Sequence, residues 1–209
     1  MNPEERKEQT ERLLKERGIP YIDWLPTVED ENEVVLRDIK DVGRRIICLF
    51  CLAGTAFNEG DNEYTEYLKK HDLWKYLSKE ERNYLSRPTY GTQTQINASW
   101  RLEALYLLVW AVQLVPDLPF PTEQASVNEF IDSIPASDES PEQFISSLQL
   151  RPISEIMDAA DLTYRLHWAV RQSGESLELD GGVVQERHHA VNWLTNYDGE
   201  KWDWVATDT

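Results

Sequence analysis

The fold is decided by residues 182–194, which read Gly-Val-Val-Gln-Glu-Arg-His-His-Ala-Val-Asn-Trp-Leu. At about 100° per residue on a helical wheel, the apolar members of this stretch fall on one broad arc, which predicts a helix with a buried face. Glu186 and Arg187 lie inside that arc. Because a buried charge is stable only when it is paired or hydrogen-bonded, this helix is predicted to bring a polar cluster into the core. His188 lies at the border of the arc, and His189 and Asn192 point away from it.

Three more stretches repeat apolar residues with the helical period, and with residues 183–197 they are predicted to form the centre of the fold. They are residues 34–57, 99–115 and 152–173. Nearly every position from 99 to 115 is apolar, which is typical of a helix covered on all sides. Charged residues again stand among apolar neighbours, Arg101 and Glu103 in that helix and Asp161 and Arg165 in the next, where the acid precedes the base by four positions and favours an ion pair.

Capping signals predict shorter helices around this centre. Asn2 and Pro3 begin a peripheral helix over residues 1–17. Ser78 and Ser140 each begin a capping-box sequence.

Two further elements are expected from local sequence. Thr122 is expected to cap a helix that runs to about Ile134, and a short hairpin is expected near residues 176–184. The whole pattern predicts an all-α or mainly α protein of roughly eight helices. We expect residues 1–209 to form a single multi-helix domain in which residues 18–209 are the helical core.

The charge of the chain narrows the classes of partner. It has 21 basic and 38 acidic residues, a formal net charge of −17. Such a field repels phosphate backbones and anionic lipid, so neither nucleic acid nor a membrane surface is expected as a partner. A basic protein partner, a cation, or nothing beyond solubility would all suit this acidic surface, and solubility is the commonest explanation.

The N-terminus and the lengths of the apolar runs predict the cellular compartment of the protein. Residues 1–18 are charged throughout and lack the apolar centre of a signal peptide. The longest nearly apolar run, residues 104–115, is interrupted by Gln113 and is shorter than the ~20 residues that span a bilayer. We therefore expect a soluble protein of the cytoplasm.

The residues that often bind metals or cofactors give little signal here. Cys48 and Cys51 have the C-x-x-C spacing of a redox pair or half of a zinc site, but their neighbours are apolar and favour two reduced, buried thiols. His188 and His189 are adjacent and diverge on a helix, so they are not expected to bind one metal ion. Phosphate-loop, dinucleotide-binding and nucleophile-elbow motifs are absent, and neither a metal nor a cofactor is predicted.

The remaining candidates are charged and imidazole side chains on three central helices. In a functional interpretation Glu103 or Glu186 is a general base, His188 is its acid partner and Arg171 anchors an anionic substrate. In a structural interpretation the same residues form buried ion pairs that fix the helix register, and the sequence favours this second interpretation. The full predicted cluster, which is either a ligand site or a buried network, comprises Arg101, Glu103, Tyr164, Arg165, His167, Arg171, Glu186, Arg187, His188 and Asn192.

Four segments, at residues 100–105, 164–171, 182–194 and 202–209, together resemble a bacterial domain-of-unknown-function family, numbered 4272. The resemblance runs from about residue 18 to the end, and the first helix is less similar. It implies a helical fold and a bacterial, cytoplasmic protein, and it implies no reaction. The family pattern falls on Trp100, Arg101, Glu103, Tyr164, Arg165, His167, Trp168, Arg171, Glu186, Arg187, His188, Asn192, Trp193, Trp202 and Asp203.

These observations favour a non-enzymatic, acidic interaction protein, in its sharper form an inhibitor of a basic partner protein. The alternative is a small-molecule enzyme, a hydrolase, that uses Glu103, Glu186, His188 and Arg171. The two are distinguished by whether an open cleft lies over these residues or whether they are paired and sealed from solvent.

Overall fold

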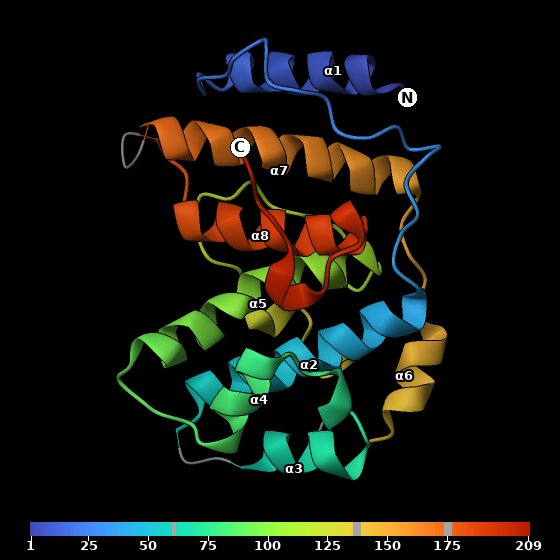
Figure 1. Cartoon of the computed structure of the whole chain (residues 1–209), viewed down its shortest axis with the longest axis vertical. Coiled ribbons are helices and arrows are strands. Elements are labelled where there is room, and N and C mark those ends of the chain that lie inside the picture. Colours follow the sequence, from blue (N-terminus) through green and yellow to red (C-terminus); the bar gives the residue numbers. More distant parts are fainter. Residues whose placement is uncertain (60–61, 136–138, 174–176) are drawn as a thin grey trace.

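In the computed structural model, helices α5 (Gln93–Ala111) and α2 (Ile39–Phe57) form the middle of the molecule, and the other helices pack in layers on either side of them (Figure 1). The structure describes residues 1–59, 62–135, 139–173 and 177–209. On the α5 side lie α8 (Gly181–Leu194), α7 (Ile153–Ser173) and α1 (Pro3–Glu16) in turn. On the α2 side lie α3 (Glu63–Lys70), α4 (Lys79–Ser86) and α6 (Pro141–Ser147). The prediction of a mainly α protein is confirmed, since these eight helices and no strand occur in the described residues.

The two central helices bury most of their apolar surface against each other and their neighbours. Every residue of α5 from Glu103 to Ala111 is buried. This helix contacts α2 on one side and α8 on the other, and α7 covers the far side of α8. Full burial of one large aliphatic side chain contributes about 1.5–3 kcal/mol. The buried polar side chains of α8, Arg187 and His188, therefore need partners inside the protein.

Single capping residues set the starts of α2 and α5, and both starts lie five or more residues from the predicted ones. Asp38 accepts from Lys40 N at 2.9 Å, so α2 begins at Ile39 and not at residue 34. Thr92 Oγ1 accepts from Gln95 N at 3.3 Å, so α5 begins six residues earlier than the predicted 99. The predicted caps at Asn2 and Ser78 are confirmed, and both complete a capping box.

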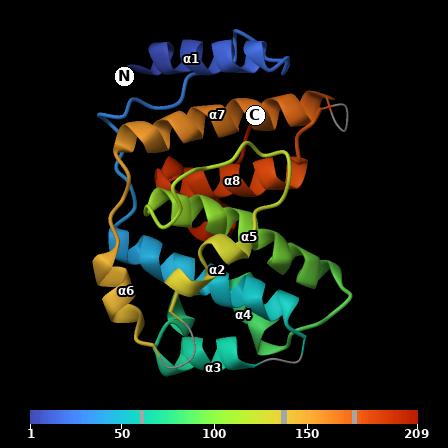
Figure 2. The same cartoon turned by 180° about the vertical axis from the view of Figure 1, so that it is seen from behind.

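The predicted helix from Thr122 to about Ile134 is wrong. The chain forms two 3₁₀ turns instead, Val127–Glu129 and Ile131–Ser133. A cap at Thr122 would use the N–H of Ala125, but that N–H donates to Glu103 Oε1 at 2.7 Å. The backbone of this connection thereby satisfies a buried carboxylate, and Figure 2 shows the connection from behind, passing over α8.

The hairpin expected near residues 176–184 is also wrong for the part of that range that is described, residues 177–184, which contains no strand. Residue 176 lies outside the described residues. Asp180 caps α8 by accepting from Gly182 N at 2.9 Å and Val183 N at 3.2 Å. These two N–H groups are thus used to begin a helix, and Asp180 N donates to Pro121 O at 2.8 Å.

Both cysteines are free thiols buried in α2, as the sequence predicts. Burial raises the pKa of the Cys48 thiol to about 12, and it raises the pKa of Cys51 well above its usual value, so both are protonated at neutral pH. Among the described helices, none combines the length and the apolar character that a bilayer-spanning segment needs.

Candidate functional site

An open cleft of about 390 Å³ lies between α4, α5, α8 and the C-terminal 3₁₀ turn Trp202–Trp204. We call it the Glu186 cleft. Its walls include the side chains of Tyr84, Trp100, Arg101, Glu186, Trp202 and Asp203. This volume lies within the range of small-ligand sites, and polar groups set among aromatic walls are typical of such sites.

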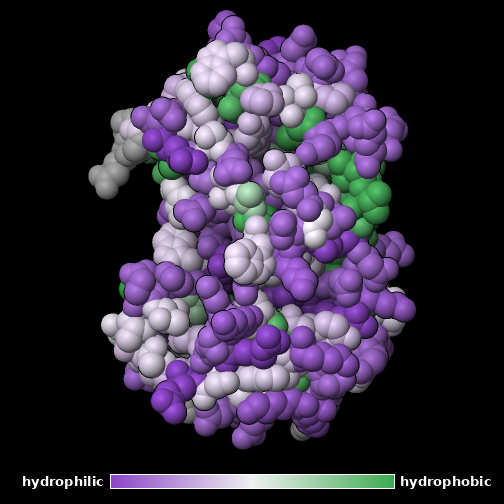
Figure 3. All heavy atoms as spheres, viewed as in Figure 1, coloured by the Kyte–Doolittle hydropathy of each residue, from purple (hydrophilic) through white to green (hydrophobic). Residues whose placement is uncertain are grey.

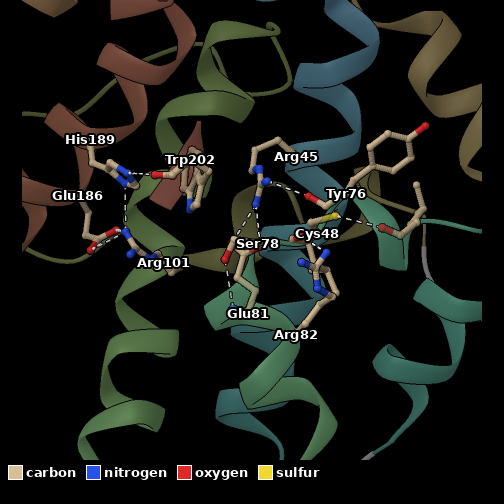
Figure 4. A network of polar contacts seen from close by, with 12 residues as sticks. Arg45, Cys48, Tyr76, Ser78, Glu81, Arg82, Arg101, Glu186, His189 and Trp202 are labelled. Atoms are coloured by element: carbon tan, nitrogen blue, oxygen red, sulfur yellow. Dashed lines mark hydrogen bonds and ion pairs between the residues drawn. The ribbon is translucent and has the colours of Figure 1, made fainter. Parts of the chain in front are cut away.

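Arg101 links two side chains of α8 at the centre of the cleft. Its Nη1 donates to Glu186 Oε2 at 3.0 Å and Oε1 at 3.3 Å, and it lies 3.0 Å from His189 Nδ1 (Figure 4). The other ring nitrogen, His189 Nε2, lies 2.8 Å from the carbonyl oxygen of Trp202. A relay of hydrogen bonds therefore runs from Glu186 through Arg101 and His189 to the C-terminal turn.

The partners of His189 determine its tautomer. A carbonyl oxygen only accepts and a guanidinium only donates, so Nε2 carries the proton and Nδ1 accepts from Arg101. Burial and then the Arg101 charge lower the pKa of His189 to about 4, because both disfavour the imidazolium form. His189 is therefore a neutral connector at physiological pH, not a proton donor to a substrate.

Trp202 lies between two arginines, one from each central helix. The Arg45 guanidinium carbon lies 4.7 Å from the centroid of its ring, and that of Arg101 lies 5.9 Å away (Figure 4). Arg45 Nη1 donates to both oxygens of Glu81 at 2.8 Å, and its Nη2 donates to Tyr76 O at 2.9 Å. Cations over an indole face are attracted by the ring quadrupole. The C-terminal turn is thus fixed to α2 and α5 through one aromatic ring.

Two polar atoms of residues that line the cleft have no hydrogen-bond partner among the described residues. They are the hydroxyl of Tyr84 and the Nε1 of Trp202, and both are buried. An unsatisfied buried polar group costs about 1–3 kcal/mol. Each of these two groups therefore carries that cost in this structure.

Glu186 is the one catalytic candidate that borders this cleft, with 14% of its side chain exposed. Burial raises the pKa of Glu186, and the Arg101 charge opposes that shift only in part. Glu103 lies elsewhere, sealed in the core against Arg187 at 3.4 Å. Arg187 Nη1 also donates to Pro119 O at 2.5 Å, so this pair joins α5, α8 and the connection that follows α5.

His188, the third catalytic candidate, is buried on the opposite side of α8 from the cleft residues and faces α7. Its Nδ1 lies 2.8 Å from Nδ1 of His167, and its Nε2 lies 3.1 Å from Asn192 Nδ2. Asn192 Nδ2 also donates to Ala206 O at 2.9 Å. The imidazole pair, with Asn192, is a structural link between α7, α8 and the C-terminal segment.

The other predicted cluster residues lie away from the cleft. Arg165 is buried and donates to Asp161 at 2.9 and 3.0 Å, which confirms the predicted ion pair. Tyr164 packs its ring 5.9 Å from that of His188. Arg171 is exposed and donates to Thr209 Oγ1 at 3.2 Å. The ten predicted residues therefore divide among five separate groups of contacts and do not form one site.

Sequence reasoning missed three residues of this region: Arg45, Glu81 and Tyr84. Arg45 carried a readable signal, since it follows Val42 by three positions and precedes Leu49 by four and so shares their apolar face. For Glu81 the sequence predicts only a role in a capping box. That role is confirmed, because Glu81 accepts from Ser78 N at 2.7 Å. Tyr84 gave no signal. Among the described residues, no group of three or more His, Cys, Asp or Glu is placed to hold a metal ion.

These features define a mainly α-helical protein with an open polar cleft between its central helices and its C-terminal turn. Residues 6–205 match the family described as Domain of unknown function (DUF4272), and the chain belongs to that family. The resemblance found in the sequence is thereby confirmed, and it extends into the first helix. No curated protein and no solved structure matches the chain.

Proposed function

We propose that this protein is an interaction protein that binds a basic partner, and that a cationic side chain of the partner enters the Glu186 cleft. The main support for this proposal is the composition of the walls of the Glu186 cleft. Four carboxylates, those of Glu80, Glu81, Glu186 and Asp203, line the cleft with one cation, Arg101. Glu81 and Glu186 are paired with arginines. Glu80 and Asp203 are exposed and have no ion pair among the described residues.

The aromatic walls suit the same occupant. Trp100 borders the cleft and is only half-buried, and an arginine or lysine over its ring gains about 0.5–2 kcal/mol. The net charge of −17 adds long-range attraction for a basic protein and speeds encounter with it. Figure 3 shows hydrophilic side chains over most of the face that carries the C-terminal turn, which fits a polar interface. In the more specific form of this proposal, binding inhibits the partner protein.

The proposed setting is the bacterial cytoplasm. Support comes from the two free thiols, Cys48 and Cys51, because thiols remain reduced in that compartment. Neither nucleic acid chains nor membrane surfaces are proposed as partners, since a strongly acidic protein is repelled by both.

Affinity capture from a lysate of the native host at low salt tests the proposal. The wild-type chain is expected to retain a basic protein in stoichiometric amount. Reversal of two cleft charges, Glu80→Lys with Asp203→Lys, is expected to abolish capture. The control, Glu4→Lys with Glu8→Lys on α1, changes the net charge equally at exposed positions away from the cleft and is expected to retain the partner. Absence of a stoichiometric partner, or equal loss in both double variants, contradicts the proposal.

One observation favours the second candidate function, a hydrolase: Glu186 is a carboxyl of raised pKa at an open cleft. Such a group is suited to act as a general base. Glu103, His188 and Arg171 do not line this cleft, so the alternative rests on Glu186 with Arg101. A screen of ester, amide and phosphoester substrates tests it, and an activity lost in a folded Glu186→Gln variant is the required result.

A further inference from the structure

A second cleft, of about 450 Å³, adjoins the Glu186 cleft and shares Ser78, Trp202 and Asp203 with it. We call it the basic cleft. Its wall cations are Arg37, Arg45, Lys75, Lys79, Arg82 and Lys201, and Asp203 is its one wall acid among the described residues. The chain as a whole has 38 acids and 21 bases, so the sign of charge is reversed here. A neighbouring recess of about 400 Å³ shares Arg37, Arg45 and Lys201 and adds Arg44 together with its ion-pair partner Asp41.

Most of these cations are not neutralised by carboxylates. Arg37 Nε donates to Trp193 O at 3.0 Å, and its Nη2 donates to Glu200 O. Arg82 Nη1 donates to Leu77 O at 2.7 Å. Bonds to carbonyls orient a guanidinium but leave its full positive charge in place.

Two lysines of the basic cleft are less constrained. Lys79 and Lys201 are exposed and form no ion pair with the described residues. Arg45 and Lys75, by contrast, are paired with Glu81 and Asp72. The free positive charge of the cleft therefore resides on Arg37, Lys79, Arg82 and Lys201.

One aromatic ring of the basic cleft contacts two of its cations. The Arg37 and Arg45 guanidinium carbons lie 5.3 and 5.9 Å from the centroid of the same ring, that of Trp193. The ring thus holds Arg37, which has no carboxylate partner among the described residues, at the wall of the basic cleft. Beside them Trp204 also lines the cleft, and 74% of it is exposed, which leaves an indole face free to stack on a planar ring.

We propose that the basic cleft binds a nucleotide, with its phosphates against Arg37, Arg82 and Lys201 and its base on Trp204. Guanidinium groups match phosphate oxygens in a bidentate geometry, and aromatic side chains stack on bases regardless of their identity. A cleft of about 450 Å³ accommodates one small ligand. The net charge of −17 disfavours a long polyanion, so the structure favours a mononucleotide over a nucleic acid chain.

Isothermal titration at low salt with ATP, adenosine and pyrophosphate tests this proposal. ATP is expected to bind, pyrophosphate more weakly and adenosine at least ten-fold more weakly than ATP. Lys79→Ala with Lys201→Ala is expected to weaken ATP binding at least ten-fold. Trp204→Ala is expected to weaken ATP several-fold and to leave pyrophosphate unchanged. All three positions are exposed, so these variants are expected to fold normally.

The matched control is Arg12→Ala with Lys15→Ala, which removes two exposed charges from α1 and is expected to bind ATP as wild type does. Equal weakening in this control and in the cleft variant would show a general charge effect and overturn the proposal. So would absence of ATP binding at millimolar concentration, or tighter binding of a glutamate-rich peptide or of single-stranded oligonucleotide than of ATP. The basic partner of the Glu186 cleft plays no part in these titrations, so the two proposals can fail separately.

Discussion

His167 Nδ1 lies 2.8 Å from His188 Nδ1, and this hydrogen bond joins α7 to α8 inside the core. The amide of Asn192 donates to His188 Nε2 at 3.1 Å, so that nitrogen accepts and the proton of His188 resides on Nδ1. His167 Nδ1 must then be the acceptor of the pair. Both imidazoles are neutral in this arrangement, because a proton added to His167 Nδ1 would face the proton of His188.

The imidazole pair predicts that acid destabilises the protein from about pH 6.5 downward. Burial, followed by the neighbouring His167 and His189, lowers the pKa of His188 to about 3. In the unfolded chain that pKa is near 6.5, so between these values the unfolded state binds a proton that the folded state does not. Stability is therefore complete above pH 6.5 and is lost as the pH falls, by up to about 1.4 kcal/mol per pH unit for this residue.

Urea unfolding at pH 7.5, 6.5 and 5.5 measures this dependence. His188→Gln lacks the titrating group, and its free energy of unfolding is expected to fall less steeply with acid than that of the wild type. Equal slopes for the two proteins would contradict the assignment of a neutral His188.

Glu103 and Glu186, the two candidate general bases, are expected to differ in their importance for folding. Glu103→Ala leaves Arg187 buried without its carboxylate and is expected to cost about 3–5 kcal/mol of stability. Glu186→Gln is expected to cost about 1 kcal/mol or less, because the site is partly exposed and the amide oxygen still accepts from Arg101. Urea midpoints of the two variants make the comparison, and a larger loss in Glu186→Gln would contradict it.

The positions of the central helices could be predicted from the sequence, because apolar residues that repeat with the helical period mark the buried face of a helix. The ends of these helices could be predicted less well, since an end depends on one capping bond. Thr122 shows the limit: its capping role is lost because Ala125 N is taken by Glu103, a residue 22 positions away. No local pattern reveals that competition.

The sequence also placed charges in the core without showing their partners. Arg101 and Glu103 of α5 pair with Glu186 and Arg187 of α8, respectively. A helical wheel gives the face of each residue but not the register between two helices, and that register decides which pair is sealed and which borders a cleft. The clefts depend on the C-terminal turn, whose position is set by long-range contacts such as that of Arg45 with Trp202.

His189 is expected to fasten that turn to the core. His189→Ala removes the hydrogen bond to Trp202 O and the one to Arg101 Nη1, and it is expected to cost about 1–3 kcal/mol. Hydrogen exchange at residues 201–205 is expected to accelerate. Asn192→Ala is the matched comparison, because it releases Ala206 O and leaves the bond at Trp202 intact. Exchange near Trp202 that is unchanged in His189→Ala would show that side-chain packing alone holds the turn.

Gly182 is expected to set the width of the Glu186 cleft through its contact with Trp100. A Cβ at Gly182 would lie 2.6 Å from two ring carbons of Trp100, so Gly182→Ala must displace the indole, and such overpacking costs about 1–3 kcal/mol. Gly181→Ala is the control, because its Cβ would meet only a methyl of Val170, at 3.0 Å. Both positions lie in the first turn of α8, where alanine favours the helix, so backbone propensity does not separate them. Urea unfolding and capture of the basic partner are both expected to be impaired in Gly182→Ala and nearly normal in Gly181→Ala. Equal stability of the two variants would mean that Trp100 moves freely, and the cleft would then not have a fixed aromatic wall.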